Sequence, residues 1–334
     1  MRLTLQLLWH TRLPRPGHLA QNSPMPSGAP SAVEDFESER PHLQALAYRM
    51  LGSRAEAEDA VQEAWLRYDK AREEGEIHDV RGWLTTVTGR ICLDVLRSAR
   101  VRREAYPGQW LPEPVVTAGP AEAVETRQEV GLALLVVLEK LTPEQRVAVV
   151  LHDAFTVPFD EIAGVLRSSV EAARQHASRG RRAIAADGAR HTAGLAEQRR
   201  VLEAFLAAAS SGDLNALAAV LAPDVVAIGD GGGVVSAGTR PVVGADKVAR
   251  FYAGLFRRRP AVLSLDPVLV NGDAGLLLRG TYDDGRQVVA VIGFAVADDR
   301  ITGIYNQLNP AKLGSIPGFV TRFPPRDDSI PDRG

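Results

Sequence analysis

The 334-residue sequence has almost no cysteine, no long apolar run and no excess of charge of either sign. Its one cysteine, Cys92, excludes a disulfide framework and any zinc or iron–sulfur site built from several cysteines. The longest apolar run, residues 130–138, is far shorter than the roughly 18 residues that a membrane span needs. Because 39 Lys and Arg balance 41 Asp and Glu, a uniformly cationic surface for nucleic acid is also excluded. Any contact with nucleic acid therefore has to come from locally sorted charge.

The N-terminal segment, residues 1–33, lacks the pattern of an export signal. Such a signal needs an uninterrupted apolar core of about 7–15 residues. Here Thr4 and Gln6 interrupt the apolar residues, and Arg12 and Arg15 follow them. We expect a disordered extension, a cytoplasmic chain and no membrane partner.

Hydrophobic periodicity divides the rest of the chain into helical parts and a later part rich in short strands. Helical spacing dominates twice, with a Pro-rich and Gly-rich stretch between, and β-rich runs alternate with turn signals after about residue 195. The expected strands are residues 225–228, 262–270, 275–282, 288–296 and 301–308. The predicted parts are a disordered extension at 1–33, a helical bundle at 35–103, a linker at 104–121, a helix-turn-helix domain at 122–190, an α+β domain at 195–315 and a flexible tail at 316–334.

The helix expected over residues 57–68 carries two different stripes. An apolar stripe at i, i+3, i+4 and i+7 spacing should face the core: Val61, Ala64, Trp65 and Tyr68. A second stripe is acidic and polar with one leucine: Asp59, Gln62, Glu63 and Leu66. Periodicity alone favours a solvated face for the second stripe, but its composition also suits docking on a basic partner helix.

The charge reverses in the next helix. Residues 81–103 hold six arginines against one acid, Asp94. Arginines neutralise phosphates, and a neighbouring aromatic ring can stack on an unpaired base. The alternative, an amphipathic helix with a buried tryptophan, is about equally well supported by this stretch alone. The candidate DNA-binding residues are Trp83, Arg97, Arg100, Arg102 and Arg103.

Two runs of this part of the chain resemble region 2 of the sigma-70 family of RNA polymerase sigma factors. The first goes from Arg49-Met50-Leu51-Gly52 through Asp59-Ala60-Val61-Gln62-Glu63. The second goes from Gly82-Trp83-Leu84-Thr85-Thr86-Val87 through Asp94-Val95-Leu96-Arg97. They are closest to the extracytoplasmic-function (ECF) group. The resemblance implies that Asp59, Gln62, Glu63 and Leu66 dock on a coiled coil of the largest catalytic subunit of the polymerase. It also implies that the following loop and helix recognise and melt the −10 promoter element.

The second helical domain has the spacing of a helix-turn-helix. Thr142-Pro143-Glu144-Gln145 predicts a capping box with Pro at the first helical position, and that helix should run to about His152. Ser168-Ser169-Val170-Glu171 predicts a second capping box, which opens the third helix. At about 100° per residue, small and apolar residues of the third helix should face inward. They are Val170, Ala173, Ala177 and Ile184.

The outward face of this third helix is basic and polar, as expected of a major-groove reader. Its residues include Arg174, Gln175, Ser178, Arg181 and Arg182. Arg174 and Gln175 should touch base edges, while Arg181 and Arg182 should hold phosphates. Gly180 lies within the helix and is expected to fray it. The whole segment resembles sigma region 4, which implies binding to the −35 promoter element.

The linker contains Tyr106-Pro107-Gly108-Gln109-Trp110-Leu111-Pro112-Glu113-Pro114. The two final prolines favour an extended, semi-rigid chain, which leaves Trp110 and Leu111 exposed unless another segment covers them. Simple packing on the nearest helical domain would also account for them. The run resembles a linker motif of the SigJ-like ECF subgroup, whose members carry a fused SnoaL-like domain. The resemblance implies communication between linker and C-terminal domain.

Residues from about 196 to 315 resemble the SnoaL-like fold of the nuclear transport factor 2-like superfamily, an α+β cone of helices over a curved sheet. The features that carry it include Asp230-Gly231-Gly232-Gly233, and the closing Asn309-Pro310-Ala311-Lys312-Leu313 resembles a terminal motif of the fused subgroup. Asp230 is best explained as a turn-forming residue. The predicted domain has no histidine, which removes the commonest general base. The expected regulatory contacts are Trp110, Leu111, Asp230, Asn309 and Lys312.

The sequence as a whole therefore predicts two all-α domains, a sigma region 2 bundle and a sigma region 4 helix-turn-helix, followed by an α+β cone. The leading hypothesis is a sigma factor that binds RNA polymerase core and promoter DNA, regulated by its own C-terminal domain. We expect no catalytic residue, no metal and no cofactor, and leave open a small ligand in the C-terminal pocket. Two alternatives remain: a ligand-sensing DNA-binding regulator, and a DNA-binding module fused to an isomerase-like enzyme.

Overall fold

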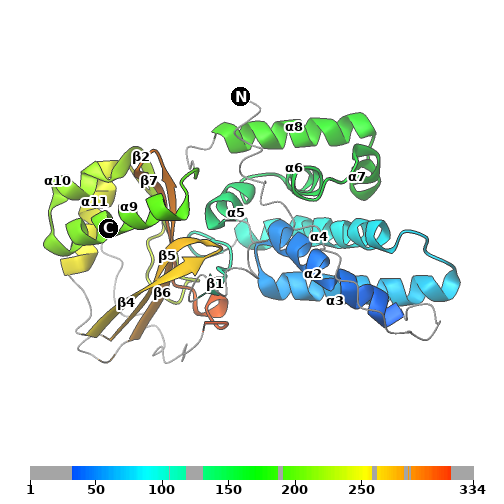
Figure 1. Cartoon of the computed structure of the whole chain (residues 1–334), viewed down its shortest axis with the longest axis horizontal. Helices are drawn as coiled ribbons and strands as arrows, with labels where there is room; N and C mark the ends of the chain where they lie inside the picture. The colour runs from blue at the N-terminus through cyan, green and yellow to red at the C-terminus, as the bar shows by residue number, and fades with distance from the viewer. Residues whose placement is uncertain are drawn as a thin grey trace, which may run out of the picture. The chain divides into compact units, whose positions relative to one another are not determined.

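The computed structural model of the chain describes residues 32–104, 106–117, 131–186, 191–257, 262–281, 285 and 287–316 (Figure 1). The described residues form two compact units, one within Met1–Val101 and Leu138–Ile184, the other within Arg102–Val137 and Ala185–Gly334. The expected linker, residues 104–121, thus belongs to the second unit as far as it is described. The expected extension and tail lie almost entirely outside the described residues.

The first half of the helical unit consists of α2 (Ala32–Leu51), α3 (Arg54–Glu74) and α4 (Val80–Glu104). Ser53 begins α3 by accepting a hydrogen bond from Glu56 N at 3.4 Å. The inward stripe expected on α3 is confirmed for Val61, Ala64 and Tyr68, which are fully buried, whereas Trp65 is only half-buried.

The second half of the helical unit consists of the end of α5 (Leu132–Leu138), then α6 (Pro143–Val149), η2 (Val150–Ala154), α7 (Phe159–Leu166) and α8 (Val170–Ala186). The capping box at Thr142 and Gln145 is confirmed. The helical segment continues past the expected end at about His152, to Ala154, but its last part, η2, is a π-helix. The second capping box is wrong: Ser169 Oγ alone caps α8, accepting from Ala172 N at 3.1 Å.

Helix α8 packs its small residues inward, as predicted. Ala173 and Ala177 are fully buried. The helix does not fray at Gly180, where a Cβ would lie 2.6 Å from Val149 Cγ2. This glycine is therefore explained by the close approach of α6 and α8 rather than by a helix end.

The described residues of the second unit form a seven-stranded sheet in the order β1-β4-β5-β6-β7-β2-β3. Neighbouring strands are antiparallel except for the parallel pair β2 and β7. All five strand runs expected from the sequence are present. The strands are β1 (Val116–Thr117), β2 (Leu221–Asp230), β3 (Val242–Val243), β4 (Val262–Val270), β5 (Asp273–Thr281), β6 (Gln287–Ala297) and β7 (Arg300–Gln307).

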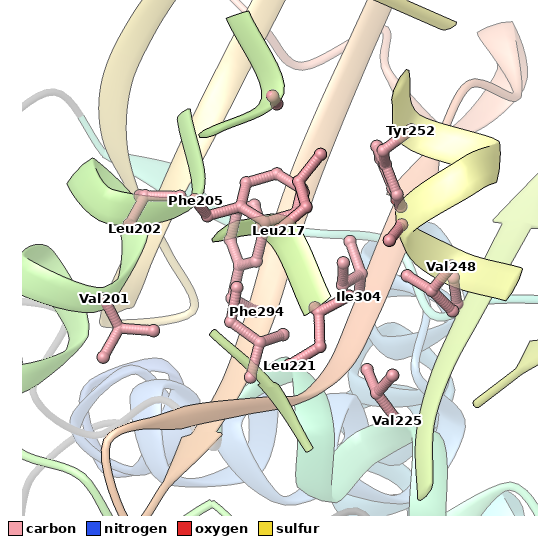
Figure 2. Packing of buried hydrophobic residues seen from close by; sticks show 14 of the residues in the cluster. Val201, Leu202, Phe205, Leu217, Leu221, Val225, Val248, Tyr252, Phe294 and Ile304 are labelled. Carbon is pink, nitrogen blue, oxygen red and sulfur yellow. The ribbon is translucent and has the colours of Figure 1, made fainter. Parts of the chain in front are cut away.

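One face of this sheet is covered by α9 (Leu195–Ser211), α10 (Leu214–Ala219) and α11 (Ala245–Arg257). Figure 2 shows the core between them, where Phe205 and Tyr252 come from the helices and Phe294 comes from the sheet. The Phe205 ring lies 5.4 Å from that of Tyr252 and 5.8 Å from that of Phe294. These aromatic contacts fill the interior of the cone.

The opposite face of the sheet is covered by segments that precede the domain in the sequence. Successive strand residues point to opposite faces, so Val291 and Ala295 lie on the side away from Phe294. They join a second core with Leu111 of the linker and Leu132 of α5. This burial explains why the linker and the start of α5 belong to the second unit. The short helix η3 (Pro310–Lys312) follows β7.

Candidate functional site

The predicted polymerase-docking stripe on α3 faces outward. Asp59, Gln62 and Leu66 are exposed, Leu66 with 63% of its surface accessible. Glu63 is half-buried and accepts from Arg67 Nε at 2.8 Å. A leucine this exposed beside carboxylates is a surface feature that the helical core does not require. The role of the stripe stays a prediction.

The predicted −10 contacts begin at a cavity of about 530 Å³ at the start of α4. Trp83 lines it, together with Arg90, the preceding loop and Glu161 of α7. Trp83 is half-buried, with its ring 5.8 Å from that of Tyr68. The cavity thus combines an aromatic wall with one arginine and several carboxylates.

Among the remaining arginines of α4 that were predicted to bind DNA, only Arg97 has a described side chain. Arg97 donates from Nε and Nη2 to Glu144 Oε1 of α6, at 3.1 and 3.0 Å. Arg100, Arg102 and Arg103 lie in α4, but their side chains fall outside the described part. The guanidinium of Arg97 is therefore already paired with a carboxylate of the region that is expected to bind the −35 element.

Further polar contacts join α2 to the segment α6–η2 within the helical unit. Arg146 is buried, forms an ion pair with Glu139 and donates Nη2 to Arg49 O at 3.4 Å. Burial lowers the pKa of Arg146 to about 9. Burial, with Arg81 and Arg49 nearby, also lowers the pKa of His42 to about 4.

The recognition helix α8 presents most of its predicted DNA-binding residues to solvent. Arg174, Gln175, Ser178 and Arg182 are exposed. Arg181 instead forms an ion pair with Asp153, its Nε donating to Oδ2 at 2.8 Å, and this bond raises the pKa of its guanidinium. Its expected phosphate contact stays a prediction, but Arg181 already joins α8 to η2.

All five predicted regulatory residues meet in the second unit, around a carboxylate with no accessible surface. Asp230 Oδ2 accepts from Leu111 N at 3.0 Å and from Lys312 Nζ at 2.7 Å. Lys312 Nζ also donates to Leu111 O at 2.6 Å and lies 3.9 Å from the centre of the Trp110 ring. Leu111 is only 1% exposed. Asp230, Lys312 and the linker therefore form one buried polar cluster, here called the linker clasp, completed by Tyr106 and Asn309.

Tyr106 is a member of the linker clasp that sequence reasoning missed as a site residue. Its hydroxyl donates to Asp230 Oδ1 at 2.6 Å and accepts from Asn309 Nδ2 at 2.8 Å. Burial, and next the bond to Asp230, raises the pKa of Tyr106. The turn role of Asp230 is confirmed as well, because Oδ1 accepts from Gly232 N at 3.0 Å. Gly232 has φ 64°, and a Cβ there would lie 2.4 Å from Asn309 Cγ.

The turn between β4 and β5 holds two other connecting segments. Asn271, 2% exposed, donates from N to Val115 O at 2.7 Å and accepts from Val115 N at 3.1 Å. Asp273 Oδ1 lies 2.9 Å from His191 Nε2, and His191 Nδ1 accepts from Val296 N at 3.1 Å. Sequence reasoning missed His191 because the predicted domain began at residue 195.

Among the residues that the structure describes, no three His, Cys, Asp or Glu side chains gather where they could hold a metal ion. Tyr252 is buried and bonded to Asn306, and burial raises the pKa of its hydroxyl. Asp230 is already bonded to the linker, and both ring nitrogens of His191 are engaged. None of the described helices is long and apolar enough to span a membrane.

Models of three protein families match separate parts of the chain. The model described as Sigma-70 region 2 matches residues 36–102. The model described as Sigma-70, region 4 matches residues 131–184, and that of the SnoaL-like domain matches residues 202–304. The three expected fold types, two helical sigma regions and an α+β cone, are confirmed.

Individual relatives share this whole arrangement. The ECF RNA polymerase sigma factor SigJ of Mycobacterium tuberculosis (strain H37Rv) is 43% identical over 295 residues, covering 85% of this chain and 94% of its own length. The probable ECF sigma factor SigI of the same organism is 37% identical over 283 residues, covering 83% and 93%. The crystal structure of SigJ superimposes with a TM-score of 0.68 at 40% identity, over 84% of this chain and 98% of that one.

Proposed function

The chain belongs to the ECF sigma factors of RNA polymerase. We propose that three of its surfaces have separate roles in transcription initiation. The α3 stripe binds polymerase core, α4 and α8 read the promoter, and the linker clasp controls how the two helical regions are presented. The work takes place in the cytoplasm, where the polymerase acts.

The docking surface is proposed on the coiled coil of the largest catalytic subunit. Asp59, Gln62 and Leu66 are exposed on α3, and Glu63 lies beside them. Carboxylates steer a basic partner helix, while an exposed leucine adds apolar contact once water is excluded.

Promoter reading is proposed to need a rearrangement of the helical unit. Trp83 at the cavity offers a face on which an unpaired base of the −10 element can stack. Arg97 would bind a phosphate, but Glu144 occupies its guanidinium. Release of Glu144 would free Arg97 for the −10 strand and α6–α8 for the −35 element.

Control by the C-terminal domain is carried by one observation: Asp230, buried with no accessible surface, is bonded to the linker and to Lys312. Two opposite charges are rarely buried unless their mutual geometry is satisfied. Here Lys312 donates to the backbone oxygen of Leu111 and lies over the ring of Trp110, so its charge is satisfied by the linker. The linker that separates region 2 from region 4 is thus fastened to the domain by charge. Fastening and release would change the spacing available to the two promoter-reading regions.

The turn between β4 and β5 supports the same proposal from a second place. Asn271 bonds Val115, at the end of the linker, and Asp273 bonds His191, just after α8. The segments that enter and leave region 4 are therefore both bonded to one turn of the C-terminal domain. This arrangement favours regulation by contact over regulation by chemistry.

The experiment compares the full-length chain with its Trp110→Ala and Lys312→Met variants in promoter-dependent transcription with polymerase core, at matched core occupancy. Both variants loosen the linker clasp, so both should change transcription in the same direction. Arg200→Ala is the control, since it removes an exposed ion pair with Asp299 in the same unit. Equal activity of all four proteins would show that the C-terminal domain does not regulate transcription through the linker clasp.

A further inference from the structure

The promoter-reading face of α8 contains one arginine that is exposed and yet held in place. Arg174 has its guanidinium carbon over the ring of Phe159, 5.7 Å from the ring centre. Phe159 is the first residue of α7. A cation within about 6 Å of an aromatic face is attracted by the ring quadrupole. Arg174 therefore has a preferred position before any DNA arrives.

The ring of Phe159 is itself fixed by residues of η2. The ring of His152 stacks on it, with centres 4.2 Å apart and planes inclined by 22°. His152 Nδ1 lies 2.7 Å from Asp153 Oδ1 and 2.9 Å from Arg181 Nη2. One chain of contacts thus runs from Arg181 through η2 to Phe159 and ends at Arg174. The π-helical form of η2 fits this assignment, because π-turns are frequent at functional sites.

We propose that Phe159 is a positioning residue for promoter reading, an aromatic platform that holds Arg174 ready for a guanine of the −35 element. The inference rests on the proposed role of Arg174 as a base reader. A free arginine loses much rotamer freedom when it docks, and a side chain placed beforehand loses less. A cation–π contact also needs no hydrogen bond from the guanidinium, so its N–H groups stay available for the two acceptors of guanine.

The test uses full-length chain and polymerase core on a promoter library randomised across the −35 region, with transcripts counted by sequencing. Arg174→Ala should abolish the preference for one base. Phe159→Leu should weaken that same preference about two- to fivefold, the ratio that an exposed cation–π contact supports. Phe159→Tyr keeps the ring and should keep the preference. In the Arg174→Ala background, Phe159→Leu should have no further effect on base preference.

The controls separate positioning from folding. Phe155→Leu removes another aromatic side chain of the same region, one that contacts His42 and not Arg174, and should leave base preference unchanged. Phe159→Met, which replaces the ring with a flexible apolar chain, gives a second reading if Phe159→Leu folds poorly. A uniform loss on all promoters with either Phe159 variant, at unchanged preference, would overturn the inference. If Arg174→Ala itself keeps the full preference, the proposed reader is wrong, and that result is distinguishable from failure of Phe159 alone.

Discussion

Several charged side chains are exposed on the helical unit, while those in the linker clasp of the second unit are buried. On α3 and α8, Asp59 and Arg174 face solvent. In the linker clasp, Asp230 has no accessible surface and Lys312 lies against it. Burial of a charge is costly unless a partner compensates it, whereas an exposed charge keeps its water. The exposed set is thus available to a partner molecule, and the buried set holds the chain to itself.

Arg97 and Arg181 lie between these extremes. Each was expected to contact DNA, and each is bonded to a carboxylate of the helical unit, Glu144 or Asp153. Glu144 joins two different sigma regions, while Asp153 and Arg181 belong to the same one. The first pair must break for Arg97 to bind a phosphate, and Asp153 likewise engages the guanidinium of Arg181, which is expected to hold a phosphate. Some of the charged residues that are expected to bind a partner molecule are therefore exposed, while others are already paired within the helical unit.

The largest expected effect comes from reversing charge in the exposed set. Asp59→Arg with Glu63→Arg should abolish association with polymerase core while the fold stays intact. Reversal replaces attraction by like-charge repulsion, which costs several kcal/mol. Native gel electrophoresis or light scattering with purified core measures the association, and circular dichroism measures the fold.

A matched reversal tests whether position or net charge matters. Glu73→Arg with Glu74→Arg makes the same change at exposed positions near the C-terminal end of α3, about two turns beyond Leu66. This control should keep most of the association. Wild-type association by the first pair, or equal loss from both pairs, would contradict the assignment of the stripe.

The next effect comes from breaking the buried set. Lys312→Met should leave Asp230 buried without its cation and destabilise the linker clasp by about 3 kcal/mol. Hydrogen exchange at the amide of Leu111, which donates to Asp230, reports the local opening. Exchange should accelerate about 100-fold, as that free energy requires.

Two comparisons sharpen the reading of the linker clasp. Adding Asp230→Asn to Lys312→Met removes the uncompensated charge and should recover part of the stability. Arg200→Met breaks an exposed pair with Asp299 and should cost at most about 1 kcal/mol. Equal exchange rates in Lys312→Met and the wild type would show that the cation contributes nothing.

The smallest effect concerns pH and the helical unit. The pKa of His42 is lowered to about 4 in the folded chain, whereas an unfolded histidine titrates near 6.5. Between these values the unfolded chain binds more protons, so stability is complete above about pH 6.5 and falls as pH drops towards 4. We expect a loss of about 1–2 kcal/mol after allowance for partial exposure.

Urea unfolding across this pH window measures the effect. His42→Gln should flatten the dependence relative to the wild type, while His78→Gln, at an exposed position, should keep it. Parallel curves for His42→Gln and the wild type would show that His42 does not carry the coupling.

Much of the fold could be predicted because it depends on neighbours along the chain. The stripe of Val61, Ala64 and Tyr68, the cap at Thr142 and the strand runs all follow from spacing within a few residues. The prediction at Gly180 was wrong because it depended on packing between elements. Gly180 reads as a helix breaker in sequence, yet it allows α6 and α8 to approach closely.

The sequence by itself determined which segments are helices and strands, which faces are apolar and which residues of α3 and α8 can meet a partner. Only the tertiary structure decided which polar residues are buried together. Tyr106 and Asp230 are 124 positions apart, and His191 and Asp273 are 82 apart. Periodicity describes the burial of one element, but the partner of a buried charge depends on where the sheet brings distant segments. For that reason the individual hydrogen-bond partners within the linker clasp, and those of Asn271 and Asp273, appear only in three dimensions.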